Sequence, residues 1–241
     1  MRYVTDVRSW VVGSLIGLGA SSSLGATITF NNETFQAGSG FGNVASILSV
    51  SKQGNGATEY GSVLRNVSNT ADLITDNGSP VANLPGTRTW SLGELAARPT
   101  PVNVTADSFG VVFNLNEKAT EPAVTLGGFT LRFYDYANNS SFDVSYAGPT
   151  VFSELSQGTG SSGFLFHVNF QTDAEKAWFD NAANRVGMIL TASQQITDAS
   201  AGAEGFYIAA PPISAPLPAP SLLAGAGLVG LAVRRRFTRR P

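Results

Sequence analysis

The only histidine, His167, is the first candidate for acid–base or nucleophilic chemistry, because the chain has no cysteine. A serine triad also needs an activated serine, and the sequence contains no Gly-x-Ser-x-Gly elbow. His167 shares with Leu165 and Asn169 the strand face opposite a row of phenylalanines. We therefore expect a solvent-facing strand residue there, and we expect the protein to have no catalytic residue.

Carboxylates are the second candidates, because glycoside hydrolysis needs two carboxyl groups, one acting as acid and one as base. What matters is the distance between the two groups in space, not their spacing in the sequence. The closest sets in sequence are Glu117 with Glu121, Asp135 with Asp143, and Asp173 with Glu175. Each is explained more simply as a solvated loop, a strand face or a helix start. A secreted glycoside hydrolase with paired carboxylates stays open as the second alternative.

Calcium is a third possibility, because aspartate and asparagine in flexible loops supply the hard oxygen ligands that this ion prefers. Asp72 and Asp76 with Asn77 form one candidate group, and Asp135 with two following asparagines forms another. Neither group matches the twelve-residue EF-hand loop. We expect no cofactor, with calcium left open.

A cluster of tyrosines and asparagines could stack on a sugar ring and hydrogen-bond its hydroxyls. Its members are Tyr134, Tyr136, Tyr146, Asn138 and Asn139. Aromatic residues on strands are more often core or ordinary sheet surface. A carbohydrate-binding module for the exopolysaccharide of the host is therefore the first alternative, with Tyr134, Tyr136, Asn138 and Asn139 as the ligand surface.

These residues lie on elements with period-two alternation, the pattern of half-buried strands. The clearest alternation covers residues 129–134, 141–146 and 164–170, where Phe164, Phe166, Val168 and Phe170 point inward. Weaker strand candidates follow the same pattern at residues 27–30, 46–51, 102–105, 109–115, 186–192 and 205–209. Many short strands between glycine-rich turns predict an all-β fold, an antiparallel β-sandwich or jelly roll with one short helix.

The helix is expected at residues 173–183. Thr172 and Glu175 have the spacing of a capping box, and Trp178 or Phe179 would pack on the sheet. Between residues 68 and 101 the alternation fades, and the prolines near 99–101 indicate an extended connection.

Charge is divided unevenly along the chain. The chain carries 15 Lys and Arg against 17 Asp and Glu. Residues 27–210, called the body below, hold eight of the basic and sixteen of the acidic residues, for a net charge near −8. An acidic body argues against nucleic-acid binding and suits a soluble surface protein, or one that gathers divalent cations. Without cysteine the body has no disulfide and no thiolate zinc site.

The N-terminal 26 residues have the three parts of a secretory signal peptide. Arg2 and Arg8 precede an apolar run at residues 10–18, and small or polar residues fill 19–26. The mature chain is expected to begin near Thr27 after export by the Sec machinery. Cleavage after Gly25 or Ser22 stays open.

The C-terminal end combines a proline-rich spacer with an apolar run. Residues 211–220 form the spacer, and residues 221–241 form a predicted transmembrane segment with a basic stop. The uncharged run at residues 221–233 would span about 20 Å as a helix, against about 30 Å of bilayer hydrocarbon, which suits transient insertion. The stop consists of Arg234, Arg235, Arg236, Arg239 and Arg240. These arginines would stay in the cytoplasm and leave the body outside.

This tail resembles the sorting domain of bacterial PEP-CTERM proteins, the substrates of exosortases. The matching motif is Pro216, Leu217, Pro218, Ala219 and Pro220, preceded by Ala215. It is closer to the Val-Pro-Leu-Pro-Ala variant than to the common Val-Pro-Glu-Pro. The resemblance implies transient insertion in the inner membrane of a Gram-negative bacterium and cleavage near the motif by a membrane cysteine protease. Members then reach the cell surface or the extracellular matrix, usually in organisms that make exopolysaccharide.

The leading hypothesis is therefore an exported, exosortase-sorted surface or extracellular-matrix protein without catalytic activity. Its expected partners are the exosortase, the Sec machinery, the membrane and the exopolysaccharide, and not nucleic acid.

Overall fold

The computed structural model describes residues 25–36, 44–52, 56–65, 71–117, 123–153, 162–200 and 202–211. The predicted signal peptide up to residue 24, the sorting motif at 216–220 and the arginine-rich stop all lie outside these residues. Within the described ranges, no helix has the length and apolar character needed to cross a membrane.

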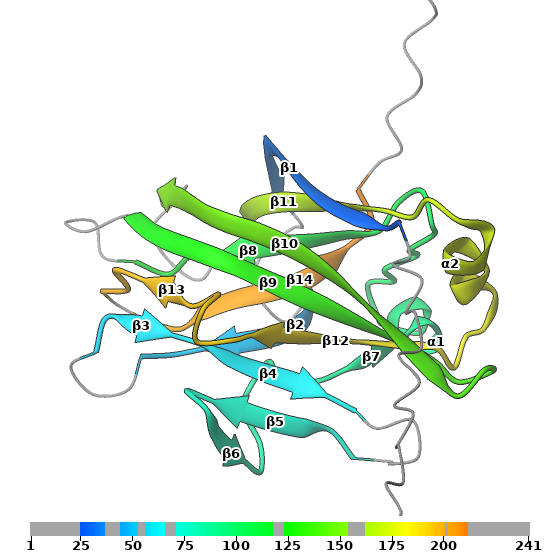
Figure 1. Cartoon of the computed structure of the whole chain (residues 1–241), viewed down its shortest axis with the longest axis horizontal. Helices are drawn as coiled ribbons and strands as arrows, with labels where there is room; N and C mark the ends of the chain where they lie inside the picture. Colours follow the sequence, from blue (N-terminus) through cyan, green and yellow to red (C-terminus); the bar gives the residue numbers. More distant parts are fainter. Residues whose placement is uncertain are drawn as a thin grey trace, which may run out of the picture.

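Two antiparallel sheets form the body, as the alternation predicts (Figure 1). The first sheet has the strand order β1-β11-β8-β14-β2. These strands span Thr27–Gln36, Ser162–Asn169, Gly110–Asn114, Glu204–Ala209 and Ala45–Val50 in that order. Its pairing joins segments far apart in sequence, because β1 pairs with β11 and β8 lies between β11 and β14.

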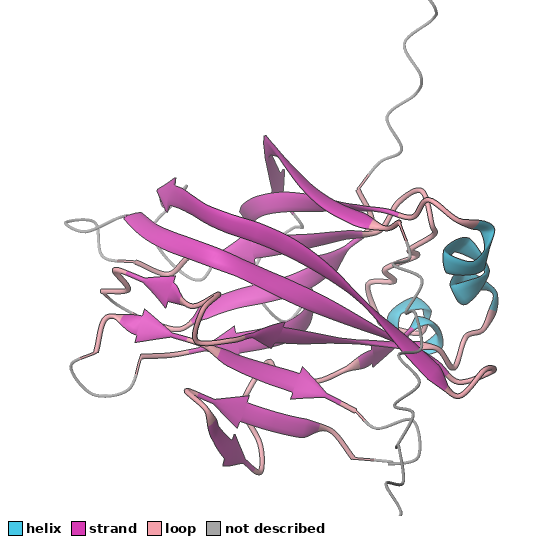
Figure 2. Ribbon diagram, in the orientation of Figure 1, coloured by secondary structure: helices cyan, strands magenta, loops and turns pink. Residues whose placement is uncertain are grey.

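The second sheet has nine strands along the path β3-β13-β9-β12-β4-β5-β6, with β10 paired to β9 and β7 to β12. Its strands are β3 Thr58–Glu59, β13 Ile196–Thr197, β9 Ala123–Asp135, β12 Arg185–Leu190, β4 Gly61–Leu64, β5 Leu73–Asp76, β6 Ser79–Val81, β10 Ser140–Ser153 and β7 Trp90–Ser91. The long β9–β10 hairpin crosses the whole layer (Figure 2).

The core lies between the sheets and is rich in phenylalanine. Phe129, Leu131 and Phe133 of β9 are fully buried, as their predicted common face requires. Phe166 of β11 packs edge-on against Phe129 at 5.1 Å between ring centroids, and this contact joins the two layers. The apolar faces of both sheets are thus removed from water together, which is the main stabilising contribution in a sandwich.

Three local predictions are wrong. Residues 102–105 are not a strand. Here Val102 donates its backbone N–H to the carbonyl of Leu95, which holds the segment against the helix α1 (Leu92–Ala96). This helix is a second one where a single short helix was expected, and it lies with β5, β6 and β7 in the region where the alternation fades.

The helix predicted at residues 173–183 is also too long. Its capping box is present, with Thr172 and Glu175 exchanging hydrogen bonds, but α2 covers only Asp173–Ala177 and continues as the 3-10 helix η2, Trp178–Asp180. Asn184 ends the helix, because its side-chain amide donates to the carbonyl of Trp178 at 2.8 Å. Trp178 packs on Phe133, as predicted.

The two ends of the sandwich differ. Both helices lie at one end, beside the turn of the β9–β10 hairpin, whereas β3 and β13 lie at the other (Figures 1 and 2). Glu175 of α2 binds the start of β1, because its carboxylate accepts the N–H of Ala26 at 2.8 Å and the N–H of Gln171 at 2.6 Å. The described chain therefore begins at the helical end.

Candidate functional site

The outer face of β9 carries the residues that the sequence singled out for ligand binding. Arg132 and Tyr134 alternate there with the buried Leu131 and Phe133. Tyr134 is on the predicted face, but it is only 4% exposed. Its phenol oxygen accepts the backbone N–H of Arg65 at 2.7 Å. Burial raises the pKa of Tyr134, so the phenol stays neutral.

Glycine explains how Tyr134 reaches across the sheet. Gly187 of β12 pairs with Arg132 of β9, and a Cβ there would meet the Tyr134 ring at 3.4 Å and the Val63 carbonyl at 2.5 Å. A side chain at this position would displace the ring or the strand. The absence of a side chain on Gly187 allows Tyr134 to lie over β12 and to reach the backbone of Arg65, the residue after β4.

Tyr134 forms part of the floor of an open pocket of about 320 Å³ on this face. The other lining residues come from β4, β5, β9 and the start of β10, namely Leu64, Arg65, Leu73, Arg132, Asn139, Ser140 and Ser141. Leu73, one of these residues, is 55% exposed and gives the pocket an apolar wall. The pocket therefore combines an apolar wall with hydroxyl, amide and guanidinium groups.

The basic lining residues already have acidic partners. Arg132 donates to both carboxylate oxygens of Asp143 on β10 at 2.7 Å, and Arg65 contacts Asp72 at 3.4 Å. Paired guanidinium groups keep fixed orientations, which favours hydrogen bonding to a neutral polar ligand over capture of a free anion.

The remaining tyrosines and asparagines are dispersed. Asn138 is exposed but donates to Asp135, which also accepts the N–H groups of Ala137 and Asn138 in the hairpin turn. Tyr136 is half-buried and does not line the pocket. Tyr146 packs inward on Phe129 and Phe166. Of the four residues predicted as a ligand surface, the structure brings Tyr134 and Asn139 together in one pocket.

The calcium candidates have protein partners. Asp72 accepts the N–H and the hydroxyl of Thr89 at 2.9 and 2.6 Å, and Asp76 accepts the amide of Asn77 at 3.1 Å. Asp135 is used within its own turn. As the side chains stand, no three His, Asp or Glu residues in the described ranges form a metal-binding group.

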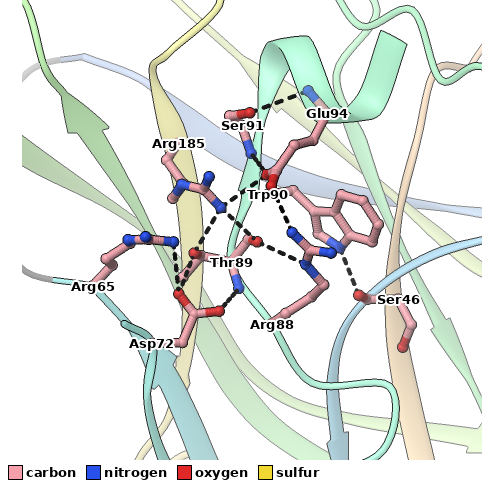
Figure 3. A network of polar contacts seen from close by, with 9 residues as sticks. All are labelled: Ser46, Arg65, Asp72, Arg88, Thr89, Trp90, Ser91, Glu94 and Arg185. Carbon is pink, nitrogen blue, oxygen red and sulfur yellow. Dashed lines mark hydrogen bonds and ion pairs between the residues drawn. The ribbon is translucent and has the colours of Figure 1, made fainter. Parts of the chain in front are cut away.

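Asp72 belongs instead to a polar network beside the pocket (Figure 3). Arg185 joins it by donating to the Thr89 carbonyl at 3.0 Å and pairing with Glu94 at 2.9 Å. Arg88 also pairs with Glu94 and lies 4.3 Å from the centre of the Trp90 ring. This network fixes the loop before β7 over the outer face of the sheet.

Replacing Asp72 with alanine is expected to lower the free energy of unfolding by about 2–3 kcal/mol, because the buried Thr89 loses both hydrogen-bond acceptors. Urea unfolding of the purified protein measures this. Asp107→Ala at an exposed loop position is the control, with a change within about 0.5 kcal/mol. Equal losses in the two variants would show that the network does not stabilise the fold.

The candidate catalytic groups are separated. His167 lies 2.8 Å from the carboxylate of Glu33 on the neighbouring strand, at the edge of the first sheet. Asp143 is held by Arg132, and Glu175 by backbone N–H groups. The predicted pair of Glu117 and Glu121 cannot be compared, since Glu121 lies outside the described residues.

Sequence reasoning missed a second group, composed of Glu59, Glu117 and Glu204. These glutamates are 0%, 5% and 0% exposed and meet between the sheets, at the end away from the helices. They come from three distant parts of the chain, so no spacing could have revealed them. Alternation does place Glu204 on the inward face of its strand, beside Phe206 and Ile208, and this was the available signal.

Comparison of the chain with protein-family models, with curated proteins and with solved structures finds no match in any of the three.

Proposed function

We propose that this chain is an exported, exosortase-sorted surface or extracellular-matrix protein whose β-sandwich body acts without catalysis. One observation carries the proposal, namely the ordered series of proline motif, apolar run and arginine cluster at the C-terminus, with a signal-like segment at the other end. The acidic, cysteine-free body is compatible with export.

Processing of the tail is tested in the native host, with and without its exosortase. The wild-type host is expected to yield a protein that lacks the arginine-rich stop and is found at the surface or in the medium. The exosortase mutant is expected to retain the full tail in the inner membrane. A chain with Pro216→Ala and Pro218→Ala serves as the matched substrate variant. The same mass and location in both hosts would refute the proposal.

The mass of the exported protein also reports on its first residue. Because Ala26 donates its N–H to the buried Glu175, removal of Ala26 would take one donor from that carboxylate. This contact favours cleavage after Gly25 or Ser22, which keeps Ala26, over the boundary before Thr27 expected from the sequence. A mature chain that begins at Thr27 would contradict this choice of cleavage site.

Carbohydrate binding is the second candidate, and the pocket over β9 favours it. Its mixture of an aromatic floor, an exposed leucine and hydroxyl and amide groups suits a sugar, which presents apolar faces and hydroxyl edges. The exopolysaccharide of the host is the proposed ligand.

Saturable binding of the purified protein to that polymer tests this candidate. Ser141→Trp, which fills the pocket, is expected to weaken binding at least tenfold. Ser145→Trp is the matched control, because Ser145 is exposed on the same face of β10 and does not line the pocket. Equal binding by both variants would exclude the pocket. Shortening of the polymer during the assay would instead support a hydrolase.

A further inference from the structure

A buried carboxylate of α2 binds the start of the described chain. The side chain of Glu175 is 0% exposed, although the residues on either side of it are exposed. Its Oε1 accepts the backbone N–H of Ala26 at 2.8 Å, whereas its Oε2 accepts the N–H groups of Gln171 and Thr172 at 2.6 and 2.9 Å. The contact with Ala26 joins segments that are 149 residues apart in sequence.

The negative charge of Glu175 has hydrogen-bond donors but no cation. Burial opposes its ionisation, but the surrounding N–H groups hold its pKa below the ordinary value, so the group is ionised at neutral pH. No Lys or Arg in the described ranges forms an ion pair with it. A buried carboxylate without a counter-ion is costly, and one cation beside Oε1 would offset much of that cost.

Ala26 is the first residue of the described chain that packs on the body. Its side chain contacts the hydrophobic core, whereas Gly25 is exposed. The strand β1 begins at the next residue, Thr27, which pairs with Asn169 of β11. The peptide bond between Gly25 and Ala26 therefore lies at the boundary of the packed body.

We propose that the signal peptide is cut between Gly25 and Ala26 and that the new α-ammonium group of Ala26 forms an ion pair with the buried Glu175. The proposal rests on export of the chain, as proposed above. Hydrolysis adds one water to the bond. The oxygen of the water joins the Gly25 carbonyl to make a carboxylate, which leaves with the signal peptide, and both of its hydrogens end on the Ala26 nitrogen.

This nitrogen already lies at hydrogen-bonding distance from Oε1 of Glu175. Before processing it is a neutral amide, and after processing it faces the same oxygen as a cation. A hydrogen bond between two charged groups is about twice as strong as one between neutral groups. The helical end of the body therefore reaches its full stability only after the signal peptide has been removed.

The residues before this bond suit a signal peptidase, which requires small residues at the first and third positions before the cut. Cleavage after Gly25 places Gly25 and Ser23 there. Cleavage after Ala26 would place Leu24 at the third position and would remove the nitrogen that faces the carboxylate. Cleavage after Ser22 would leave the charge three residues away from Ala26.

The intact mass of the protein exported by its native host tests the cleavage site. The first residue is expected to be Ala26. A first residue of Thr27 or Ser23 would overturn the proposal and leave export intact, whereas a retained signal peptide would refute export itself.

Thermal unfolding tests the ion pair with two purified forms that share the same C-terminus. The form that begins at Ala26 is expected to melt about 4–8 °C above the form that begins at Gly25 at pH 7, because only the first places the charge beside Oε1. The α-amino group of Ala26 is also expected to be acetylated about tenfold more slowly than that of Gly25. The reason is that Glu175 favours the protonated amine, which is not nucleophilic.

Glu175→Gln is the decisive variant, because glutamine also serves at this position of a capping box but carries no charge. Both differences between the two forms are expected to vanish in it. Glu94→Gln is the matched control, since Glu94 has the same position in the capping box of α1, and it is expected to keep both differences.

Two results would overturn the ion pair: equal melting temperatures of the two wild-type forms, or an unchanged difference between them in Glu175→Gln. The first comparison does not depend on the folding of any variant.

Discussion

Raising the pH from 5 to 8 is expected to lower the free energy of unfolding by about 4 kcal/mol. The cause is Glu204, because burial, together with the neighbouring Glu59 and Glu117, raises its pKa from 4.5 to about 12 in the folded protein. Below pH 4.5 both the folded and the unfolded chain hold this proton, so its contribution to stability is complete. Above that pH the unfolded chain releases the proton and the folded chain keeps it. Each pH unit then costs about 1.4 kcal/mol, and Glu59 adds to the loss.

Other shifted carboxylates act at lower pH and do not obscure this effect. Burial opposes ionisation of Glu175, but the N–H groups of Thr172, Ala26 and Gln171 together hold its pKa below the ordinary value. Burial likewise opposes ionisation of Glu94, whereas the N–H of Ser91 and the guanidinium of Arg185 lower its pKa. Their stabilisation is present above pH 4.5 and is lost as the pH falls through the lowered pKa values. Stability is therefore expected to be greatest near pH 4–5.

Urea unfolding at half-unit pH steps measures the slope. Glu204→Gln has no proton to release and is expected to flatten most of the slope, whereas Asp107→Asn, at an exposed loop position, is expected to leave it unchanged. Two results would show that Glu204 is ionised in the folded protein. One is a free energy of unfolding that rises between pH 5 and 8, and the other is an unchanged pH slope in Glu204→Gln.

The long strands were predictable because their apolar residues alternate in the sequence with the same two-residue period as their buried side chains in the structure. Phe129, Leu131 and Phe133 alternate with Thr130 and Arg132, and the structure places the first set inside and the second outside. The predicted faces of β10 and β11 are likewise confirmed, because Val144, Phe166 and Val168 are buried. A strand of eight or more residues repeats its alternation often enough to be recognised.

Short elements were not predictable by this pattern. β5, β6 and β7 have two to four residues, too few for a period to appear. Turn and helix-cap residues could have predicted these short elements. Asn77 and Gly78 both have positive φ, 46° and 78°, as a two-residue hairpin turn requires. Ser91 and Glu94 form the same kind of capping box that identified α2.

The candidate site depended on contacts between distant segments. Alternation assigned Tyr134 to the outer face correctly, but its burial depends on contacts such as that with the backbone of Arg65, which reaches it from another part of the chain. The glutamate cluster has the same origin, since its members meet only when the two sheets pack. A sequence pattern predicts which residues share one face of a strand. Whether other segments bury that face depends on the tertiary structure.

Replacing Phe133 with alanine is expected to lower the free energy of unfolding by about 3–5 kcal/mol, since it opens a cavity where the two sheets and the helical end meet. Phe133 is fully buried, and its ring lies 5.0 Å from that of Phe142, 5.1 Å from Trp178 and 5.4 Å from Phe170. These rings come from β9, β10, η2 and the residue after β11, and they interlock mostly edge to face, so they cannot close the cavity without moving backbone.

The loss in Phe133→Ala is measured by urea unfolding at pH 5, close to the pH at which stability is expected to be greatest. Val151→Ala is the control, because Val151 is 68% exposed on β10 and its truncation leaves no cavity. Trp178 donates its indole N–H to the carbonyl of Tyr134 at 3.0 Å, so a shift of the indole ring would also disturb the strand that forms the pocket floor. Phe133→Ala should therefore weaken polymer binding as well. A loss of less than about 1 kcal/mol in the free energy of unfolding would mean that the aromatic cluster repacks around alanine and does not fix the position of β9.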